Sequence, residues 1–295
     1  MRKSKIIIPI IIAVLILSTT VVQGDYSVTV GQTFTYNVNT SNWSIKLGSN
    51  SGSASKCRIF LDPYDEGTSF TVNVTDVVPT DSVSWNLTVG STDYEWQNDD
   101  FDLMQITLLL FEILPYAVSF ANTWAQDAVD SGPPLQTFFF FDIADDVTFD
   151  HFRFLANSTF WSLGAASDTR LSFTQADGNF DESGVVAVFD WIFDGTITYA
   201  TPYNFEIEGV ERLKIAFDTS TGVMQGYRLE LDHKGVIEGQ NFEMKLNQEV
   251  TINGYTLPAF YYDKPAGLPG FEWYLSITAF SAILIVSVIL KKKRK

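Results

Sequence analysis

Residues 70–87 read FTVNVTDVVPTDSVSWNL, and this stretch decides the expected fold. Apolar and polar residues alternate in both halves: Val72 and Val74 lie among Thr and Asn residues, and Trp85 and Leu87 lie among Ser, Asn and Thr residues. Such alternation places one side of an extended strand in a core and the other in solvent. The Pro-Thr-Asp triplet between the halves is a turn sequence. The stretch therefore predicts a hairpin in an antiparallel sheet with one solvated face.

The same alternation recurs late in the chain. It is present at 213–217 and 223–231, on either side of the loop sequence DTSTG, and again at 242–246. These segments predict further antiparallel strands. We expect a mainly β (α+β) fold, with an antiparallel sheet that is sandwich-like or a curved half-barrel.

The centre of the sequence breaks this pattern. Residues 103–114, LMQITLLLFEIL, are nearly all apolar and follow three Asp residues that suit a helix N-terminus. They predict an apolar helical insertion buried against the sheet, with a second helix over 116–129. A membrane span is the alternative, but Glu112 and Pro115 interrupt it.

A possible internal boundary follows this insertion. The Ser-Gly-Pro-Pro sequence at 131–134 is a breaker, and the four Phe residues at 138–141 begin strand-like sequence again. Two interpretations remain open: one β-rich ectodomain over 25–262 with a helical insertion, or two sheet modules joined near 131–134.

The first 24 residues have the three parts of a secretory signal peptide. Three basic residues lie among the first five, residues 6–17 are apolar apart from one Pro, and Val-Gln-Gly at 22–24 is a small-residue exit. We expect cleavage after Gly24, with an uncleaved signal anchor as the alternative. The domain that follows is predicted to lie outside the cell.

The carboxyl end predicts a membrane anchor. A Pro/Gly spacer at 263–272 leads into residues 273–290, which carry no charge, and five basic residues close the chain at 291–295. Eighteen helical residues span about 27 Å, close to the thickness of the hydrocarbon core. We expect a single transmembrane helix with a cytoplasmic basic tail.

Pro269-Gly270-Phe271, followed by an apolar span and a basic cluster, resembles the tripartite sorting signals of archaeal surface proteins. The resemblance covers about the last thirty residues. It implies processing by an archaeosortase and attachment to a membrane lipid; a simple transmembrane anchor explains the same residues. Signal peptide, β-rich ectodomain and tail together look like anchored cell-surface proteins of Asgard-type archaea, which implies an architecture and no activity.

The charge of the chain limits the classes of partner that we expect, and its cysteine content limits the disulfides that it can form. Residues 25–270 hold 11 basic and 34 acidic residues, a formal charge of −23. A field of this sign repels phosphate backbones, so nucleic acid is excluded as an expected partner. The single cysteine, Cys57, cannot form an intramolecular disulfide and is interpreted as an ordinary strand residue.

Five Asn-x-Ser/Thr sequons fit an extracellular glycoprotein. They are Asn39, Asn42, Asn73, Asn86 and Asn157. Asn73 and Asn86 fall on the polar side of their predicted strands, so glycans there would point to solvent.

No catalytic motif is present, and we expect a protein without enzymatic activity. His151 and His233 have no second His at metal-ligand spacing and are expected at the surface. Asp177, Asn179 and Asp181 have the spacing of calcium ligands, but Glu182 and Val188 stand where a calcium loop needs Gly and a bidentate acid. An acidic turn between strands is the preferred interpretation, with calcium as the alternative.

The expected function is therefore a membrane-anchored surface protein with a structural, adhesive or binding role, in contact with another surface protein or a glycan. The alternative is a tethered carrier or sensor of a lipid or other apolar ligand, whose pocket would be lined by Leu108, Phe111 and Phe139. An extracellular hydrolase comes third.

Overall fold

The computed structural model describes residues 26–79, 81–99, 101–122, 124–143, 147–157, 170–200 and 203–263. The signal peptide, most of the spacer and the predicted transmembrane helix lie outside these residues. Residues up to Leu257 belong to one compact unit, and Pro258–Lys295 form a second. Of the second unit, residues 258–263 are described, with one 3-10 turn, η2, at Tyr261–Asp263.

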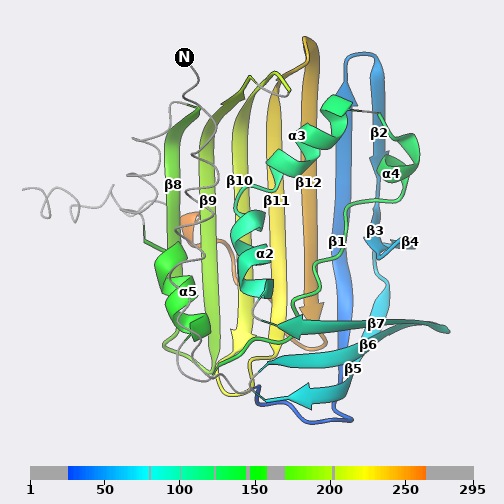
Figure 1. Ribbon diagram of the computed structural model, residues 1–295, viewed down its shortest axis with the longest axis vertical. Coiled ribbons are helices and arrows are strands. Elements are labelled where there is room, and N and C mark those ends of the chain that lie inside the picture. The colour runs from blue at the N-terminus through cyan, green and yellow to red at the C-terminus, as the bar shows by residue number, and fades with distance from the viewer. Residues whose placement is uncertain are drawn as a thin grey trace, which may run out of the picture. The chain divides into compact units, whose positions relative to one another are not determined.

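A ten-stranded antiparallel sheet dominates the described residues of the first unit (Figure 1). Its strand order is β7-β6-β5-β1-β12-β11-β10-β9-β8, and β2 pairs with β1. The strands are β1 (Thr33–Leu47), β2 (Asn50–Ala54), β5 (Ser69–Val78), β6 (Ser82–Val89), β7 (Thr92–Asp99), β8 (Leu171–Asp181), β9 (Val186–Tyr199), β10 (Phe205–Asp218), β11 (Met224–Ile237) and β12 (Gln240–Ile252). The prediction of a mainly β fold with an antiparallel sheet is confirmed.

The predicted hairpins have the expected register. Val72 pairs with Leu87 and Val74 with Trp85, and all four side chains are buried. At the β10–β11 turn the Asp218 carboxylate accepts hydrogen bonds from the backbone and hydroxyl groups of Ser220 and Thr221.

The first and the last strand of the large sheet in chain order, β1 and β12, are neighbours in the middle of the sheet. β1 pairs with β12, so strands from both sides of residues 131–134 belong to one sheet. A small second sheet, β3 (Lys56–Ile59) with β4 (Asp62–Asp65), follows β2. Cys57 lies on β3 and is buried.

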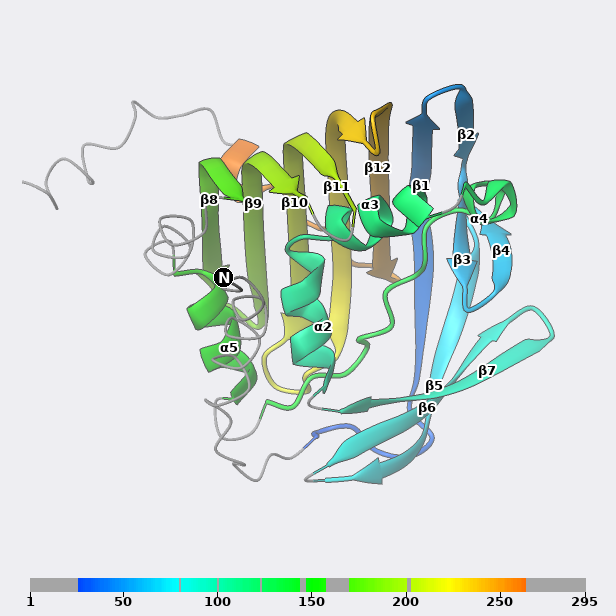
Figure 2. The ribbon, with the colours of Figure 1, turned by 45° about the horizontal axis from the view of Figure 1, so that its top comes forward.

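In the described part of the stretch between β7 and β8, four helices cover one face of the large sheet (Figure 2). They are α2 (Phe101–Leu109), α3 (Ile113–Asn122), α4 (Gln126–Asp130) and α5 (Val147–Leu155). α3 contacts β11, α4 contacts β2, and α5 contacts β8. Among the described residues no single helix is long and apolar enough to cross a membrane, although α2 and α3 together pass that test as a pair bent by 75°.

The predicted helix boundaries at 103–114 and 116–129 are wrong, because partners from the sheet break the apolar run earlier. Trp191 Nε1 donates to the carbonyl oxygen of Leu110 at 3.2 Å, next to the end of α2. The Glu211 carboxylate accepts the backbone N–H of Glu112 at 2.7 Å and that of Ile113 at 3.4 Å. These two donors are unpaired groups of a helix N-terminus, so Glu211 caps α3 and fixes its start.

The strand expected from Phe138 onward is also wrong. All four Phe side chains at 138–141 are buried, whereas a sheet strand with one solvated face would expose alternate residues. The segment makes only an isolated bridge between Phe140 and Val223 within the described residues. Its rings instead fill the space between sheet and helices: Phe139 contacts Tyr36 and Trp85 with ring centroids 5.0 Å apart.

Candidate functional site

The face of the large sheet opposite the helices carries a lattice of paired charges. Six ion pairs join directly opposite residues of β1, β9, β10, β11 and β12. They are Lys46–Glu243, Lys234–Glu208, Lys245–Asp232, Arg212–Glu230, Arg228–Glu249 and Lys214–Asp190. We call this surface the polar face. The charges of these six pairs cancel, but Asp194 and Glu206 lie on the same face without being among the pairs, so the face as a whole holds more acidic than basic residues. The lining of the hollow described next is balanced, with two basic and two acidic residues.

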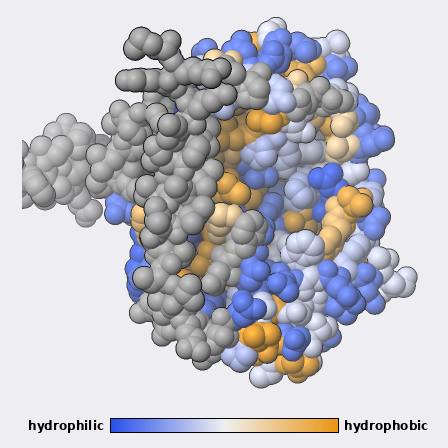
Figure 3. All heavy atoms as spheres, viewed as in Figure 1, coloured by the Kyte–Doolittle hydropathy of each residue, from blue (hydrophilic) through white to orange (hydrophobic). Residues whose placement is uncertain are grey.

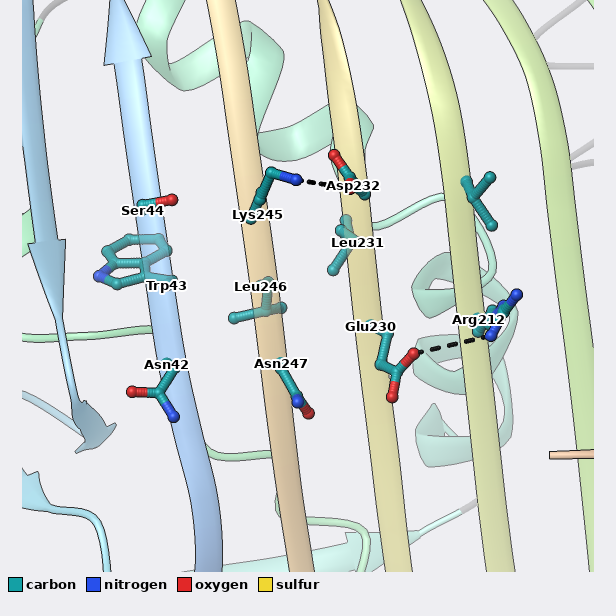
Figure 4. A pocket seen from close by; sticks show the side chains of 11 residues that line it. Asn42, Trp43, Ser44, Arg212, Glu230, Leu231, Asp232, Lys245, Leu246 and Asn247 are labelled. Carbon is teal, nitrogen blue, oxygen red and sulfur yellow. Dashed lines mark hydrogen bonds and ion pairs between the residues drawn. The ribbon is translucent and has the colours of Figure 1, made fainter. Parts of the chain in front are cut away.

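A hollow of about 610 Å³ lies in the middle of the polar face. Two neighbouring rows of side chains cross it, each row contributed by β1, β12, β11 and β10 in turn (Figure 4). The first row is Asn42, Asn247, Glu230 and Arg212, and the second is Ser44, Lys245, Asp232 and Val210. Adjacent strands are about 4.8 Å apart, so the hollow spans roughly 14 Å across the strands.

The hollow offers hydrogen-bond donors and acceptors of both signs. Lys245 Nζ lies 2.8 Å from Asp232, and Arg212 lies 3.9 Å from Glu230. Asn42 at one wall is held in place, since its amide donates to Glu66 at 2.8 Å and accepts from Ser55 at 2.7 Å. A ligand with many hydroxyl or amide groups matches such a surface, because each charged side chain can bind it while keeping its ion-pair partner.

The sequence shows the alternation that creates this site but not the site itself. Lys245 and Asp232 occupy polar positions of two separate strands, and only the register of β11 on β12 makes them neighbours. The signal available in the sequence was a charged residue at nearly every solvent position of β10, β11 and β12.

A second polar cluster lies on the opposite, helix-covered side of the sheet. Glu211 and His233 are buried there on adjacent strands, with His233 Nε2 3.9 Å from the Glu211 carboxylate. Burial raises the pKa of Glu112 to about 7 and that of Glu211 well above its usual value. Burial lowers the pKa of His233 to about 4. Of these groups, Glu211 holds the α2–α3 bend, through its hydrogen bonds to the backbone of Glu112 and Ile113.

The prediction that both histidines lie at the surface is wrong. His233 is 2% exposed, because it lies on the apolar side of β11 beneath the helices. His151 is half-buried on α5; its Nε2 lies 3.1 Å from the Thr107 hydroxyl, and burial lowers its pKa to about 4. The sequence misled because His233 follows an exposed Asp at what looked like a strand end, whereas β11 continues to Ile237.

The calcium candidates Asp177, Asn179 and Asp181 lie on β8, within a strand and not in a loop or turn. Alternate residues of a strand are about 6.7 Å apart, so three in a row cannot all reach one ion at about 2.4 Å. Asp181 instead accepts hydrogen bonds from the Ser183 backbone and hydroxyl. In the described part of the chain, no three His, Cys, Asp or Glu side chains are grouped so as to hold a metal ion.

None of the three residues expected to line an apolar pocket lines the hollow of the polar face. Leu108 is 57% exposed on α2. Phe111 packs against the rings of Trp191 and Phe193, and Phe139 is fully buried in the aromatic core. The large hollow is on the other face of the sheet from these rings. The apolar-carrier alternative remains a hypothesis, for which native mass spectrometry of the purified protein is the test.

The sequons lie on strands and on one helix end. Asn39 and Asn42 are on β1, Asn73 and Asn86 are on β5 and β6, and Asn157 follows α5. Asn73 and Asn86 are directly opposite each other. Opposite side chains in an antiparallel pair begin about 5 Å apart, so two glycans there would crowd one another.

The sorting motif at 269–271 lies outside the described residues. Comparisons with family models, with curated proteins and with solved structures gave no match for this chain.

Proposed function

We propose that this chain is a membrane-anchored cell-surface protein that acts by binding and has no catalytic role, and that the hollow of the polar face is its binding site. The observation that carries the proposal is the balanced charge around that hollow, in an otherwise acidic molecule. The ligand class that fits best is a neutral, hydroxyl-rich glycan of the cell envelope.

The acidic chain repels anionic ligands but does not repel a neutral glycan. A neutral glycan needs hydrogen bonds, and the hollow supplies them from Asn247, Ser44 and two ion pairs. Four adjacent strands hold these groups by continuous ladders, so little conformational freedom is lost on binding. A curved half-barrel arrangement of these strands is part of the proposal.

Membrane attachment belongs to the same proposal and is supported by the sequence. Residues 273–290 and the basic tail suit a transmembrane anchor, and Pro269-Gly270-Phe271 suits archaeosortase processing. Truncation after residue 262 should move the protein from the membrane fraction into the medium of the expressing cells. Retention of the truncated chain in the membrane fraction would contradict attachment through this tail.

Glycan binding is tested with the full-length protein on an array of neutral and charged glycans. We expect neutral glycans to bind, and Asn247→Ala to weaken the best of them at least fivefold by removing a two-way hydrogen-bonding group. The matched control is Lys234→Ala, which lies on the same polar face but outside the hollow. Equal binding by Asn247→Ala and the unaltered protein would assign the ligand to another surface.

A further inference from the structure

The β3–β4 hairpin ends in a turn made of two large apolar residues. Phe60 has a φ of 54°, in the left-handed region that favours glycine or asparagine. Leu61 beside it is 86% exposed. Turns of this kind are usually built from small polar residues. Phe60 is partly buried against the core, but its backbone geometry disfavours a large residue, and neither backbone geometry nor burial explains Leu61.

The Phe60 ring belongs to an aromatic cluster at the surface, formed with Tyr94 and Trp96 of β7. Phe60 stacks on Tyr94 with centroids 5.0 Å apart and planes 15° apart, and meets Trp96 edge-on at 5.5 Å. Trp96 is 50% exposed. Figure 3 shows hydrophobic surface over the β3–β4 hairpin, at the right of the view, with hydrophilic residues around it.

A fixed carboxylate lies beside this aromatic cluster. The Tyr94 hydroxyl lies 2.6 Å from Asp62 and donates to it, and the Tyr64 hydroxyl lies 2.6 Å from that of Tyr94. The hydroxyls orient Asp62 next to the exposed rings. Rings with a carboxylate at their edge attract a cation, through the ring quadrupole and through charge.

The surrounding sequence is complementary to a cation as well. Between Arg58 and Arg153 the chain contains no Lys or Arg and 17 Asp or Glu residues. The acidic residues nearest in sequence to the aromatic cluster are Asp62, Asp65, Glu66, Asp93 and Glu95. β7 also lies at one end of the strand order, paired with β6 alone in the described residues. An extended polypeptide can add to such an edge.

We propose that the aromatic cluster and Asp62 form a docking site for an extended, Lys- or Arg-bearing segment of a partner protein. A guanidinium or ammonium group lies over the Trp96 and Phe60 rings and pairs with Asp62. The docking site is built from the β3–β4 turn, β4 and β7, whereas the proposed glycan site is built from β1, β10, β11 and β12, so either can fail without the other.

Fluorescence anisotropy with the full-length protein tests this docking site. The probe is a labelled (Arg-Thr)4 peptide, compared with its citrulline counterpart, which keeps the shape of arginine without the charge. At about 0.15 M salt, where surface attraction is screened beyond about 8 Å, we expect only the arginine peptide to bind. Trp96→Ala and Phe60→Gly should each weaken binding about tenfold. Phe60→Gly also relieves the positive φ, so it removes the ring without straining the fold.

The control variant is Asp127→Asn with Asp130→Asn, which removes two charges from the same acidic stretch but away from the aromatic cluster. We expect it to change binding less than twofold. Equal binding of the citrulline peptide would overturn the proposal. Unchanged binding by both aromatic variants, or an equal loss in the control, would overturn it too and indicate general attraction to an acidic protein.

Discussion

The polar face and the segment between Arg58 and Arg153 use charge in opposite ways. On the polar face, six basic and six acidic residues pair across neighbouring strands. The segment between the two arginines, which includes β4 to β7, the helices α2 to α4 and the first part of α5, has 17 acids and no basic residue of its own, and Asp150 pairs with Arg153 at its boundary.

The difference shows that solvent-facing positions of a sheet can serve two purposes. Where opposite charges face each other, they cancel and leave a neutral surface that supports close approach by another molecule. Where basic residues are missing, the acidic side chains must be hydrogen-bonded or exposed. The negative potential of such a surface attracts cations. Asp62 and Asp102 are examples of acids held by hydrogen bonds alone.

The largest expected effect comes from breaking the buried pair of the polar face. Lys214 and Asp190 are almost fully buried and lie 2.5 Å apart. Lys214→Ala removes the positive charge from this buried ion pair while the Asp190 carboxylate stays buried, so we expect a loss of about 3–5 kcal/mol in the free energy of unfolding. Urea denaturation of the full-length protein measures it. The double variant Lys214→Met with Asp190→Leu should recover most of the loss; if it does not, charge pairing is not the cause.

The second-largest effect is expected at Asn98, which forms hydrogen bonds with buried polar groups of the acidic segment. Asn98 accepts from Trp85 Nε1 at 2.8 Å and donates to Asp102 at 2.7 Å and to the Thr137 carbonyl at 2.9 Å. Asn98→Ala leaves these groups without that partner, and we expect a loss of about 2–3 kcal/mol by the same urea measurement. Gln97→Ala, exposed on the other side of β7, should stay within about 0.5 kcal/mol. Similar losses for the two variants would contradict the assigned role of Asn98.

A pH series sharpens the comparison further, because the acidic segment contains Glu112, a partly buried carboxyl near the helix bend. Burial raises the pKa of Glu112 from 4.5 to about 7, so the folded protein holds a proton that the unfolded chain releases. Its contribution to stability is therefore full below pH 4.5 and is lost as the pH rises through about 7.

Glu112→Gln removes this titration and tests its sign. We expect the variant to match the unaltered protein at pH 4 and to exceed it by about 1–3 kcal/mol at pH 8, measured by urea denaturation at both values. The contribution of His151 and His233 to stability changes in the opposite direction, because it is lost as the pH falls. This contribution is the same in both proteins and therefore cancels in the difference. A difference that grows toward low pH would show that Glu112 is ionised when folded.

The smallest effect concerns an exposed pair of the polar face. Lys234 and Glu208 lie 3.2 Å apart with most of their side-chain surface in solvent. Lys234→Ala should cost no more than about 0.5 kcal/mol, because solvent already screens the pair. A loss comparable to that of Lys214→Ala would mean that the lattice acts as a cooperative network and not as separate pairs.

Much of the fold was predictable because alternation is a local property. The hairpin around residues 70–87 and the strands from 213 to 246 follow directly from it. The candidate sites were less predictable. Tyr94 and Trp96 share one side of β7, but the stacking of Phe60 on them depends on where the β3–β4 hairpin folds. The hollow depends in the same way on strand register.

The sequence by itself determined the acidic charge of this protein, predicted the strands around residues 70–87 and 213–246, and led to the expectation of an anchored, extracellular domain, because composition and period-two patterns are set residue by residue. Tertiary structure alone decided the pairing of β1 with β12, the break between α2 and α3, and the burial of His233. Each of these depends on a partner roughly 80 to 210 residues away, or on an element packed over the side chain, and such contacts leave no local pattern in the chain.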